Sequence, residues 1–520
     1  MAKIDRVKNA SRNIFFGALL KVYQICVPFL MRTAMIYFMG VQYLGLNSLF
    51  TSVLQVLNLA ELGVGYAMIF SMYKPIANDD KDTICALMKL YKIYYRIIGI
   101  VIGILGGVLL PFIPRLINGD IPDDINVYVL YILNLLATVM SYWLLAYKSS
   151  ILSAYQRNDI ISKVTILTNT IQYVLQFFVL WKFKNYYYFT IISLFTQVLT
   201  NVVTAMAANR IYPEYKPEGM LSKSQIREIN QRIKDLFTSK IGAIIVNSSD
   251  TIVISAFLGL TVLAVYQNYY YILSSVLAIV TIIFSSCTAG IGNSIIVETK
   301  EKNFNDLKKF TFIITWIAGF CSCCFLNLFQ PFMEIWVGKK LMLEYKAVIC
   351  FVVYYYIYEI NQLLNMYKDA GGIWHEDRFR PLVTALANLG MNLIMVQFWG
   401  IYGILFSTVL SMLFIGMPWL FHNLFTTLFE KEQLQEYLKK VFFFVFVSIV
   451  VCWMSVIICN FINIGKWPTL IIRIFICMII PNVMFGIIYH RTTEYKELLL
   501  LVNNMTNGKF KGLLRKLGMN

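Results

Sequence analysis

Long apolar stretches recur throughout the 520-residue chain, and short, mostly basic segments separate them. A helix needs about 20 mainly apolar residues to cross the hydrocarbon core of a bilayer. Fourteen stretches reach that length, so the sequence predicts an all-α integral membrane protein with about 14 transmembrane helices. They cover approximately residues 14–38, 44–72, 91–114, 125–147, 160–181, 186–208, 238–259, 262–296, 308–330, 346–367, 382–399, 400–422, 441–462 and 468–490.

Composition and charge exclude several other classes. Only 14% of the residues are charged and 58% are hydrophobic, whereas about 25% of a typical soluble domain is charged. A soluble protein of this composition could not cover its surface with polar groups. The net charge of +17 does not indicate a nucleic-acid partner, because the basic residues lie in the gaps between apolar stretches.

The distribution of Lys and Arg predicts the orientation in the membrane. If the amino terminus is cytoplasmic, 33 of the 45 basic residues fall in cytoplasmic segments, seven in outer loops and five within spans. We therefore expect both termini in the cytoplasm and no cleaved signal peptide. The outer loops are short, which leaves no room for a catalytic domain on that side.

The spacing of the spans predicts two six-helix lobes followed by two additional helices. Leu-Gly-Leu occurs at 44–46 and again at 258–260. This weak similarity between the two halves favours parallel repeats with a cargo site at their interface. The expected regions are an N-terminal lobe (1–208), a cytoplasmic linker with an amphipathic helix (209–237), a C-terminal lobe (238–424), two further spans (425–490) and a basic cytoplasmic tail (491–520).

Four basic residues within spans are the candidate ligands of an anionic cargo. Lys21 and Arg32 are eleven residues apart, almost three whole turns, so they share one face of the first span about 16 Å apart along its axis. Lys92 and Arg96 share a face of the third span one turn apart. Intramembrane charges usually face a cavity or a partner. The alternative for these side chains is that they extend to the membrane interface.

Three acidic residues within spans are candidates for gating or ion coupling: Glu61, Asp250 and Glu359. Beside Glu61, the glycines at 63 and 65 would let another helix approach closely. The alternative for all three is a static bond to Asn or Ser that holds helices together, for instance between Asp250 and the neighbouring Asn247 and Ser248. Polar pairs at helical spacing, such as Gln172 with Gln176 and Gln197 with Asn201, favour interhelical hydrogen bonds over a path for sugar hydroxyls.

No residue pattern indicates an enzyme, a metal site or a cofactor. The ten cysteines lack paired metal-ligand spacing, and the three histidines lie far apart at span ends. Cys321, Cys323 and Cys324 fall in one span, where small residues that pack helices are the expected interpretation.

Several segments resemble the polysaccharide transporter branch of the multidrug/oligosaccharidyl-lipid/polysaccharide exporter superfamily. The resemblance covers residues from about 10 to 420 and looks most specific for Wzx-type polysaccharide repeat-unit flippases, while the last two spans match only in hydrophobicity. The matching segments are MGVQYLGLNSLF at 39–50, LAELGVG at 59–65, YKPIA at 73–77, SDTIVI at 249–254, RFRP at 378–381 and WGIYGI at 399–404.

The resemblance implies that the protein moves an undecaprenyl-diphosphate-linked oligosaccharide from the cytoplasmic to the outer leaflet by alternating access, for capsule, O-antigen or exopolysaccharide assembly. It further implies the bacterial cytoplasmic (inner) membrane, contact with membrane lipid, and a polysaccharide polymerase and glycosyltransferases as partners. The alternative is a cation-coupled multidrug or small-molecule antiporter of the same superfamily. Such an antiporter would need an acidic, aromatic cavity, whereas the intramembrane excess here is basic.

Overall fold

A computed structural model describes residues 6–61, 63–119 and 121–505. Every regular element in these ranges is a helix, which confirms the predicted fold class. The chain divides into two compact units, Met1–Gln267 and Asn268–Asn520, and each is described separately. Residues 506–520 of the predicted basic tail lie outside the described residues.

The described helices account for the predicted number of spans. Ten of them are long and apolar enough to cross a membrane, or eleven if the bent pair Val127–Trp143 and Ala146–Ala154 is one span. One of the ten, Trp374–Thr427, is 54 residues long and has room for two crossings. The broken segment α2–α3 and the apolar end of α9 supply the other two of the predicted fourteen.

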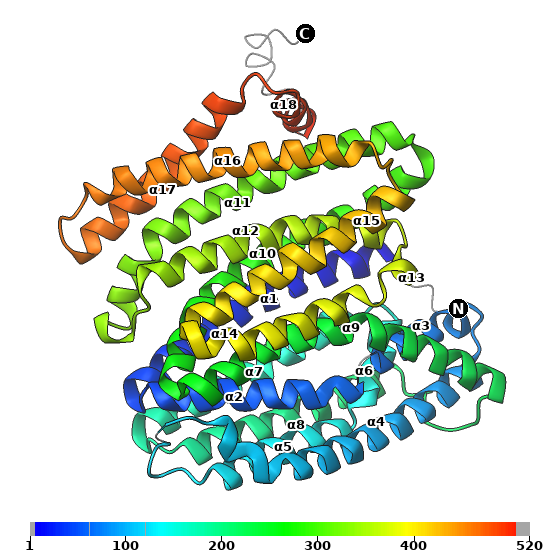
Figure 1. Ribbon diagram of the computed structural model, residues 1–520. Helices are drawn as coiled ribbons and strands as arrows, with labels where there is room; N and C mark the ends of the chain where they lie inside the picture. Colours follow the sequence, from blue (N-terminus) through cyan, green and yellow to red (C-terminus); the bar gives the residue numbers. More distant parts are fainter. Residues whose placement is uncertain (1–5, 62, 120, 506–520) are drawn as a thin grey trace. The chain divides into compact units, whose positions relative to one another are not determined.

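The first unit is a bundle in which α1 packs on α7, α4 on α5, and α7 on α8 (Figure 1). Asn and Asp side chains cap several of its helices; for instance, the Asp80 carboxylate accepts a hydrogen bond from the Thr83 N–H at the start of α4. Its elements are α1 (Arg6–Phe38), α2 (Val41–Leu57), η1 (Asn58–Glu61), α3 (Val64–Ala77), α4 (Lys81–Leu109), η2 (Leu110–Leu116), α5 (Val127–Trp143), η3 (Ala146–Lys148), α6 (Ser149–Ala154), α7 (Asn158–Lys182), α8 (Tyr186–Ile211), α9 (Lys223–Leu258) and the start of α10 (Leu260–Val297).

The predicted second span, 44–72, is not one continuous helix. It divides into α2 and α3, joined by the short 3-10 helix η1 and by Gly63, whose φ of 87° lies in the left-handed region. That conformation ends a right-handed helix, and glycine adopts it without a steric penalty. The apolar composition of 44–72 is the same on both sides of the break, so hydropathy did not reveal it.

The predicted linker helix and the seventh span form a single helix, α9. A capping box begins it, in which the Ser222 side chain and the Gln225 side chain satisfy each other's backbone N–H groups. It ends at Gly259, which has a φ of 89°. Polar residues fill its first half and apolar residues its second, which is why the sequence suggested two separate elements.

The second unit contains the rest of α10 and the helices that follow it. The predicted boundary between the spans 382–399 and 400–422 is confirmed: Gly400 has non-helical backbone angles inside α14, and Asn388 on one arm donates a hydrogen bond of 3.0 Å to the Thr408 hydroxyl on the other. The elements are α11 (Lys300–Trp336), η4 (Lys339–Leu341), α12 (Tyr345–Ala370), α13 (Trp374–Asp377), α14 (Arg380–Ser411), η5 (Met412–Gly416), α15 (Met417–Thr427), α16 (Gln433–Asn460), α17 (Lys466–Tyr489) and α18 (Thr493–Met505).

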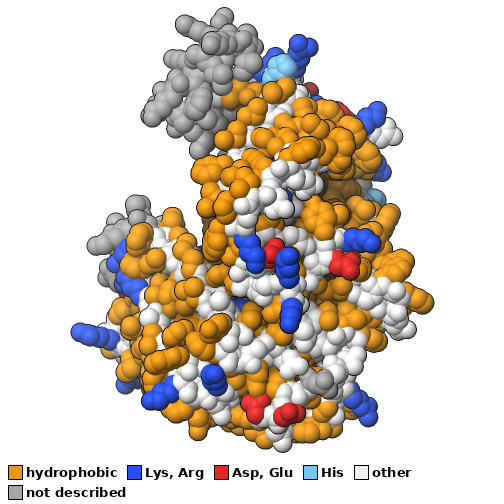
Figure 2. Space-filling model, turned by 90° about the vertical axis from the view of Figure 1, so that its left-hand side faces the viewer, with side chains coloured by type: hydrophobic (Ala, Val, Ile, Leu, Met, Phe, Trp, Pro, Cys, Tyr) orange, Lys and Arg blue, Asp and Glu red, His pale blue; other side chains and the backbone are white. Residues whose placement is uncertain are grey.

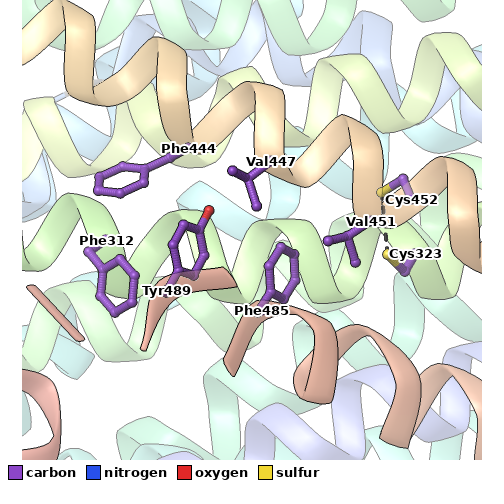
Figure 3. Close-up of a cluster of buried hydrophobic side chains, with 8 residues drawn as sticks. All are labelled: Phe312, Cys323, Phe444, Val447, Val451, Cys452, Phe485 and Tyr489. Atoms are coloured by element: carbon purple, nitrogen blue, oxygen red, sulfur yellow. Dashed lines mark hydrogen bonds between the residues drawn. The ribbon is translucent and has the colours of Figure 1, made fainter. Parts of the chain in front are cut away.

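The last two spans pack against α11 through a cluster of buried side chains (Figure 3). Phe312 of α11, Phe444 of α16 and Phe485 of α17 are all fully buried in it. The Cys323 and Cys452 sulfur atoms lie 3.3 Å apart where α11 meets α16. The predicted packing role for the cysteines of this span is thereby confirmed for Cys323.

Helix α18 is held on α16 by an ion pair outside the membrane-spanning segments. The Lys440 Nζ donates to the Glu494 carboxylate over 2.6 Å, and the Glu494 side chain is only 6% exposed. Burial alone would raise the pKa of Glu494, but the hydrogen bond and charge of Lys440, together with a backbone hydrogen bond and one from Thr493, outweigh it and hold that pKa below its ordinary value.

Candidate functional site

Close packing of α4 on α5 positions the two basic residues predicted on the third span. A Cβ at Gly99 would lie 2.3 Å from the Trp143 indole nitrogen, and one at Gly106 would lie 2.4 Å from a Leu135 methyl group. Small residues allow helices in a membrane to approach this closely. The Trp143 indole N–H donates a 3.2 Å hydrogen bond to the Arg96 carbonyl, which fixes α4 against α5 at this level.

Lys92 and a lysine outside the predicted set converge on one buried tyrosine. The Lys92 and Lys148 Nζ atoms each lie 5.9 Å from the Tyr147 ring centroid, at the outer limit for a cation–π contact. Lys148 is buried and donates a 2.7 Å hydrogen bond to Asn209. Arg96 follows Lys92 by one turn on the same helix face. We call Lys92, Arg96 and Lys148 the basic cluster.

Lys21 and Arg32 lie on α1, which packs on α7 and α2 rather than within the basic cluster. Lys21 is exposed within the described structure and Arg32 is half-buried. Tyr23 faces α7, because its hydroxyl is 2.9 Å from the Thr170 hydroxyl. Lys21 precedes Tyr23 by two residues, which corresponds to a rotation of about 200° around the helix. Lys21 therefore lies on the side of α1 opposite to the contact between Tyr23 and α7. The structure does not place the α1 pair beside the α4 pair.

Glu61 sits at the break between α2 and α3 and is bound by tyrosines. The Tyr95 hydroxyl donates to the Glu61 Oε1 over 2.9 Å, and the Tyr91 hydroxyl donates to the Tyr95 hydroxyl over 2.6 Å. Tyr142 of α5 also lies beside Glu61, and its ring packs edge-on against Tyr95 with centroids 5.3 Å apart. We call these four residues the Glu61–tyrosine cluster. It ties η1 to α4 and α5.

The glycines that follow Glu61 allow the expected close approach. A Cβ at Gly63 would lie 2.7 Å from the Leu236 Cβ on α9, and a Cβ at Gly65 would lie 3.0 Å from the Tyr91 hydroxyl. The prediction that another helix approaches at this point is confirmed.

Asp250 is half-buried on α9, within the first unit. Of the two alternative partners, Ser248 does not bond it, because the buried Ser248 hydroxyl has no hydrogen-bond partner in the part of the chain that the structure describes, and the side chain of Asn247 lies outside the described residues. One residue beyond Asp250, the Thr251 hydroxyl accepts a 2.9 Å hydrogen bond from Gln267 of α10.

Glu359 is in the second unit, on α12, and is 1% exposed. Its neighbours include Tyr355 on the same helix and, through that tyrosine, Cys321 of α11. Among the described residues, its Oε1 has no hydrogen-bond partner. Ionisable groups inside a membrane bundle are costly and commonly functional.

The two Leu-Gly-Leu segments lie against each other. A Cβ added to Gly45 would meet the Leu260 carbonyl oxygen at 2.3 Å, and one added to Gly259 would meet the Asn118 carbonyl oxygen at 2.6 Å. The Asn118 N–H donates to the Ser255 carbonyl over 2.9 Å. We call this meeting of α2 with the α9–α10 junction the Gly45 contact. Only residues without a side chain permit it.

The polar pairs bond neighbouring helices, as favoured from their spacing. Gln176 of α7 donates to the Ser193 hydroxyl of α8 over 2.6 Å, and Asn201 of α8 donates to the Ser141 carbonyl of α5 over 2.7 Å.

Sequence reasoning missed Lys148 and the tyrosine partners of Glu61. Lys148 looked like a loop residue because it follows an apolar stretch, and only the bend between α5 and α6 turns it inward. Tyr91 and Tyr95 did offer a signal: they share the face of α4 that is buried, one helical turn apart.

Comparisons with known proteins bear on the fold. No family model matches the chain, and no curated protein matches it. Solved structures do match. A lipid II flippase MurJ in an inward closed conformation gives a TM-score of 0.67 at 14% identity, over 92% of this chain and 99% of that chain.

Two transporters match somewhat less closely. An inward-facing multidrug resistance MATE family transporter of the MOP superfamily gives a TM-score of 0.59 at 15% identity, over 81% of this chain and 99% of that chain. A MOP superfamily transporter from Pyrococcus furiosus, described as having a binding pocket of reverse polarity, gives a TM-score of 0.51 at 12% identity. The match covers 82% of this chain and 96% of that chain. The chain therefore has the fold of the MOP-type transporters and is a multi-pass membrane protein.

Proposed function

We propose that this protein is a flippase that carries an undecaprenyl-diphosphate-linked oligosaccharide repeat unit from the cytoplasmic to the outer leaflet of the bacterial inner membrane. The observation that carries the proposal is the basic cluster, in which Lys92 and Lys148 lie beside Tyr147 and Arg96 follows Lys92 by one helical turn. A diphosphate needs several cations along its path, and Arg and Lys both bind phosphate oxygens with charge-assisted hydrogen bonds.

The fold supports a transporter of this class. A polar headgroup would pay a large desolvation cost in hydrocarbon, whereas its lipid tail can stay in the bilayer. The protein therefore has to supply a hydrated, basic route for the headgroup alone. The MurJ structure that shares the fold is of a lipid II flippase. Its 14% identity carries no further detail, so the choice of cargo rests on the basic residues and on the Wzx-type motifs.

Lys21 and Arg32 supply the second pair of cations in this proposal. They lie on a different helix from the basic cluster, so the two groups would act at different stages of translocation rather than as one binding site. The excess of basic over acidic residues disfavours the alternative of an antiporter for cationic drugs. Pocket polarity differs among proteins of this fold, as the Pyrococcus furiosus transporter illustrates.

The Gly45 contact would be one of the two gates. Alternating access requires that a contact on one side closes while the other side is open. Gly45 belongs to the predicted first lobe and Leu260 to the predicted second, so their backbone contact joins segments that would separate when the gate opens.

The Glu61–tyrosine cluster would couple the break between α2 and α3 to the state of the transporter. Glu61 touches α4 through Tyr95 and α5 through Tyr142. A change in the charge of Glu61 would therefore act on three helices at once. Asp250 and Glu359 are further candidates for ion coupling.

A flipping assay tests the proposal. Proteoliposomes would contain the purified protein and an undecaprenyl-diphosphate oligosaccharide with a fluorescent sugar, and dithionite would quench the label on the outside. We expect wild-type protein to expose the inner pool to quenching, and Lys21→Ala with Arg32→Ala, or Arg96→Gln with Lys148→Met, to abolish that exposure.

Lys182→Met serves as the matched control because Lys182 is an exposed lysine at the end of α7, outside both basic groups. Wild-type flipping by both double variants would refute the assignment of the cations. Failure of the wild-type protein to move this lipid, alongside movement of a cationic dye, would favour the antiporter.

A further inference from the structure

The second unit holds a charged cavity that the proposed function does not use. Two adjoining hollows, of about 440 and 270 Å³, lie between the end of α11 and the segment that joins α16 to α17. They share the lining residues Gln330, Pro331, Asn460 and Arg473. Together they are large enough for the headgroup of a lipid or a small anion.

The charges of this cavity are unbalanced. Lys339, Lys466 and Arg473 line it together with a single carboxylate, that of Glu334. Glu334 lies 3.4 Å from the Lys466 Nζ and 3.7 Å from the Lys339 Nζ, so it is shared between these two lysines. In the described part of the chain, no carboxylate pairs with Arg473.

Arg473 bonds the backbone of its own unit and also has a donor left for a ligand. It lies on α17, seven residues after the helix begins. Its two terminal nitrogens donate to the carbonyls of Asn327 and Ile462 over 3.4 and 3.2 Å. Its Nε is buried and has no hydrogen-bond partner among the described residues. An arginine with an unused donor beside a polar cavity is suited to planar, charge-assisted recognition of an anion.

Neutral donors complete the lining. The side-chain amides of Asn460 and Asn463 make no hydrogen bond within the described ranges, so both are available to a ligand. Helix α17 begins at the cavity, and its N-cap Gly465 offers no side chain to the free N–H groups of the first turn. The positive end of the helix dipole therefore adds to the field of the three cations.

The residues around the cavity are of the kinds found near lipid headgroups. Figure 2 looks onto the face that includes the α11–α12 and α16–α17 loops, and shows Lys and Arg side chains beside acidic ones within a largely hydrophobic surface. In the α16–α17 loop and the first turn of α17, Phe461, Ile464 and Trp467 are 85%, 69% and 63% exposed. Exposed aromatic and apolar side chains beside cations are typical of the level of lipid headgroups.

We infer that the α11–α17 cavity is an anion site that binds a phosphate group through Arg473, Lys466 and the amides of Asn460 and Asn463. The phosphate group is carried by a membrane lipid or is free in solution. The site is separate from the basic cluster of the first unit, and it holds whether or not the protein is a flippase.

Binding is measured on the purified full-length protein in detergent, with phosphatidylglycerol brominated in its acyl chains as a quencher of Trp467. The difference in fluorescence between wild-type protein and Trp467→Phe isolates this tryptophan. We expect saturable quenching, and a loss of affinity of about 10- to 150-fold in Arg473→Gln, because the variant removes a charge-assisted hydrogen bond to the phosphate. Arg473→Lys keeps the positive charge but not the planar guanidinium group, so it should lose less affinity than Arg473→Gln.

Lys340→Gln is the matched control because Lys340 is adjacent to Lys339 but does not line the cavity. Lys466→Gln leaves the buried contacts of Arg473 intact, so it keeps the test decisive if Arg473→Gln fails to fold. The second experiment uses inorganic phosphate and measures the melting temperature. We expect phosphate to raise the melting temperature of wild-type protein but not that of Arg473→Gln.

Quenching that depends on Arg473 and Lys466 without a phosphate effect identifies a lipid headgroup, and the reverse result identifies a free anion. Competition between phosphate and the lipid supports a site open to both. Equal binding by wild-type protein, Arg473→Gln and Lys466→Gln in both arms would overturn the inference.

Discussion

The sharpest structural test concerns the Gly45 contact. In the variant Gly45→Ala, the new Cβ would lie 2.3 Å from the Leu260 carbonyl oxygen and 3.0 Å from its carbonyl carbon. An ordinary contact begins near 3.4 Å, so the helices must separate by about 1 Å. The atom in the way belongs to the backbone, and no side-chain rotation can relieve the overlap.

The free-energy cost can be bounded. Overpacking by one methyl group in a close-packed site costs about 1–3 kcal/mol. If that cost falls only on the state in which the contact is closed, the population of the open state rises by about 5- to 150-fold. The rest of the first unit is unaffected, because the open state does not contain the overlap.

Thiol accessibility measures this shift. Ser255 is fully buried on α9, one turn before Gly259, and Ser255→Cys changes little volume. In detergent, N-ethylmaleimide should modify Cys at 255 in the Gly45→Ala protein about 5- to 150-fold faster than in the parent. Peptide mass spectrometry separates this thiol from the ten native cysteines.

Gly107→Ala is the control, because a Cβ at Gly107 would meet nothing within 4 Å. It should leave the labelling rate unchanged. Equal rates for Gly45→Ala and Gly107→Ala would show that the contact does not close a gate, and the reasoning would fail.

Four other outcomes are expected. Glu494→Gln keeps an amide oxygen but removes the negative charge that pairs with Lys440. It should lower protection from hydrogen exchange over 493–505 by about 1.5 kcal/mol, the lower end for a charged hydrogen bond because its lysine partner is 35% exposed. The folded pKa of Glu494 is lowered, so in the wild type the same protection should be present above the ordinary glutamate pKa and be lost as the pH falls through the folded pKa. Gly319→Ala should lower the melting temperature, because its Cβ would lie 2.7 Å from the Phe485 ring, at a cost of about 1–3 kcal/mol. Glu61→Gln keeps a hydrogen-bond acceptor for Tyr95 but removes the charge, and should abolish the dependence of flipping on an ion gradient while the protein stays folded.

Glu494→Gln and Gly319→Ala each have a control variant, and the other two predictions have an outcome that would contradict them. Glu436→Gln breaks an ion pair whose carboxylate side chain is 53% exposed, so it should change exchange over 493–505 little. Gly290→Ala meets nothing within 4 Å and should leave the melting temperature unchanged. Unchanged gradient dependence in Glu61→Gln would exclude Glu61 from coupling, and pH-independent protection of α18 would exclude the role given to Glu494.

Hydropathy determined the helical class and the approximate spans, and the residue types around Gly400 determined the break there. These follow from local properties: a backbone in lipid must satisfy its hydrogen bonds within a helix, and the Trp-Gly-Ile-Tyr-Gly segment has both turn-forming and interfacial residues. Charges inside spans could be identified in the same way, because they stand out against an apolar background.

Tertiary structure decided which of those charges meet. Lys148 joins Lys92 only because α5 and α6 bend by 45°, and Glu61 meets Tyr95 and Tyr142 only because α2 breaks beside Gly63. Arg473 stood among the intramembrane cations in the sequence, but its cavity requires α11 and α17, whose contacting residues Asn327 and Arg473 are 146 positions apart. Contacts of that separation depend on how helices pack, and hydrophobic periodicity carries no information about the partner of a given helix face.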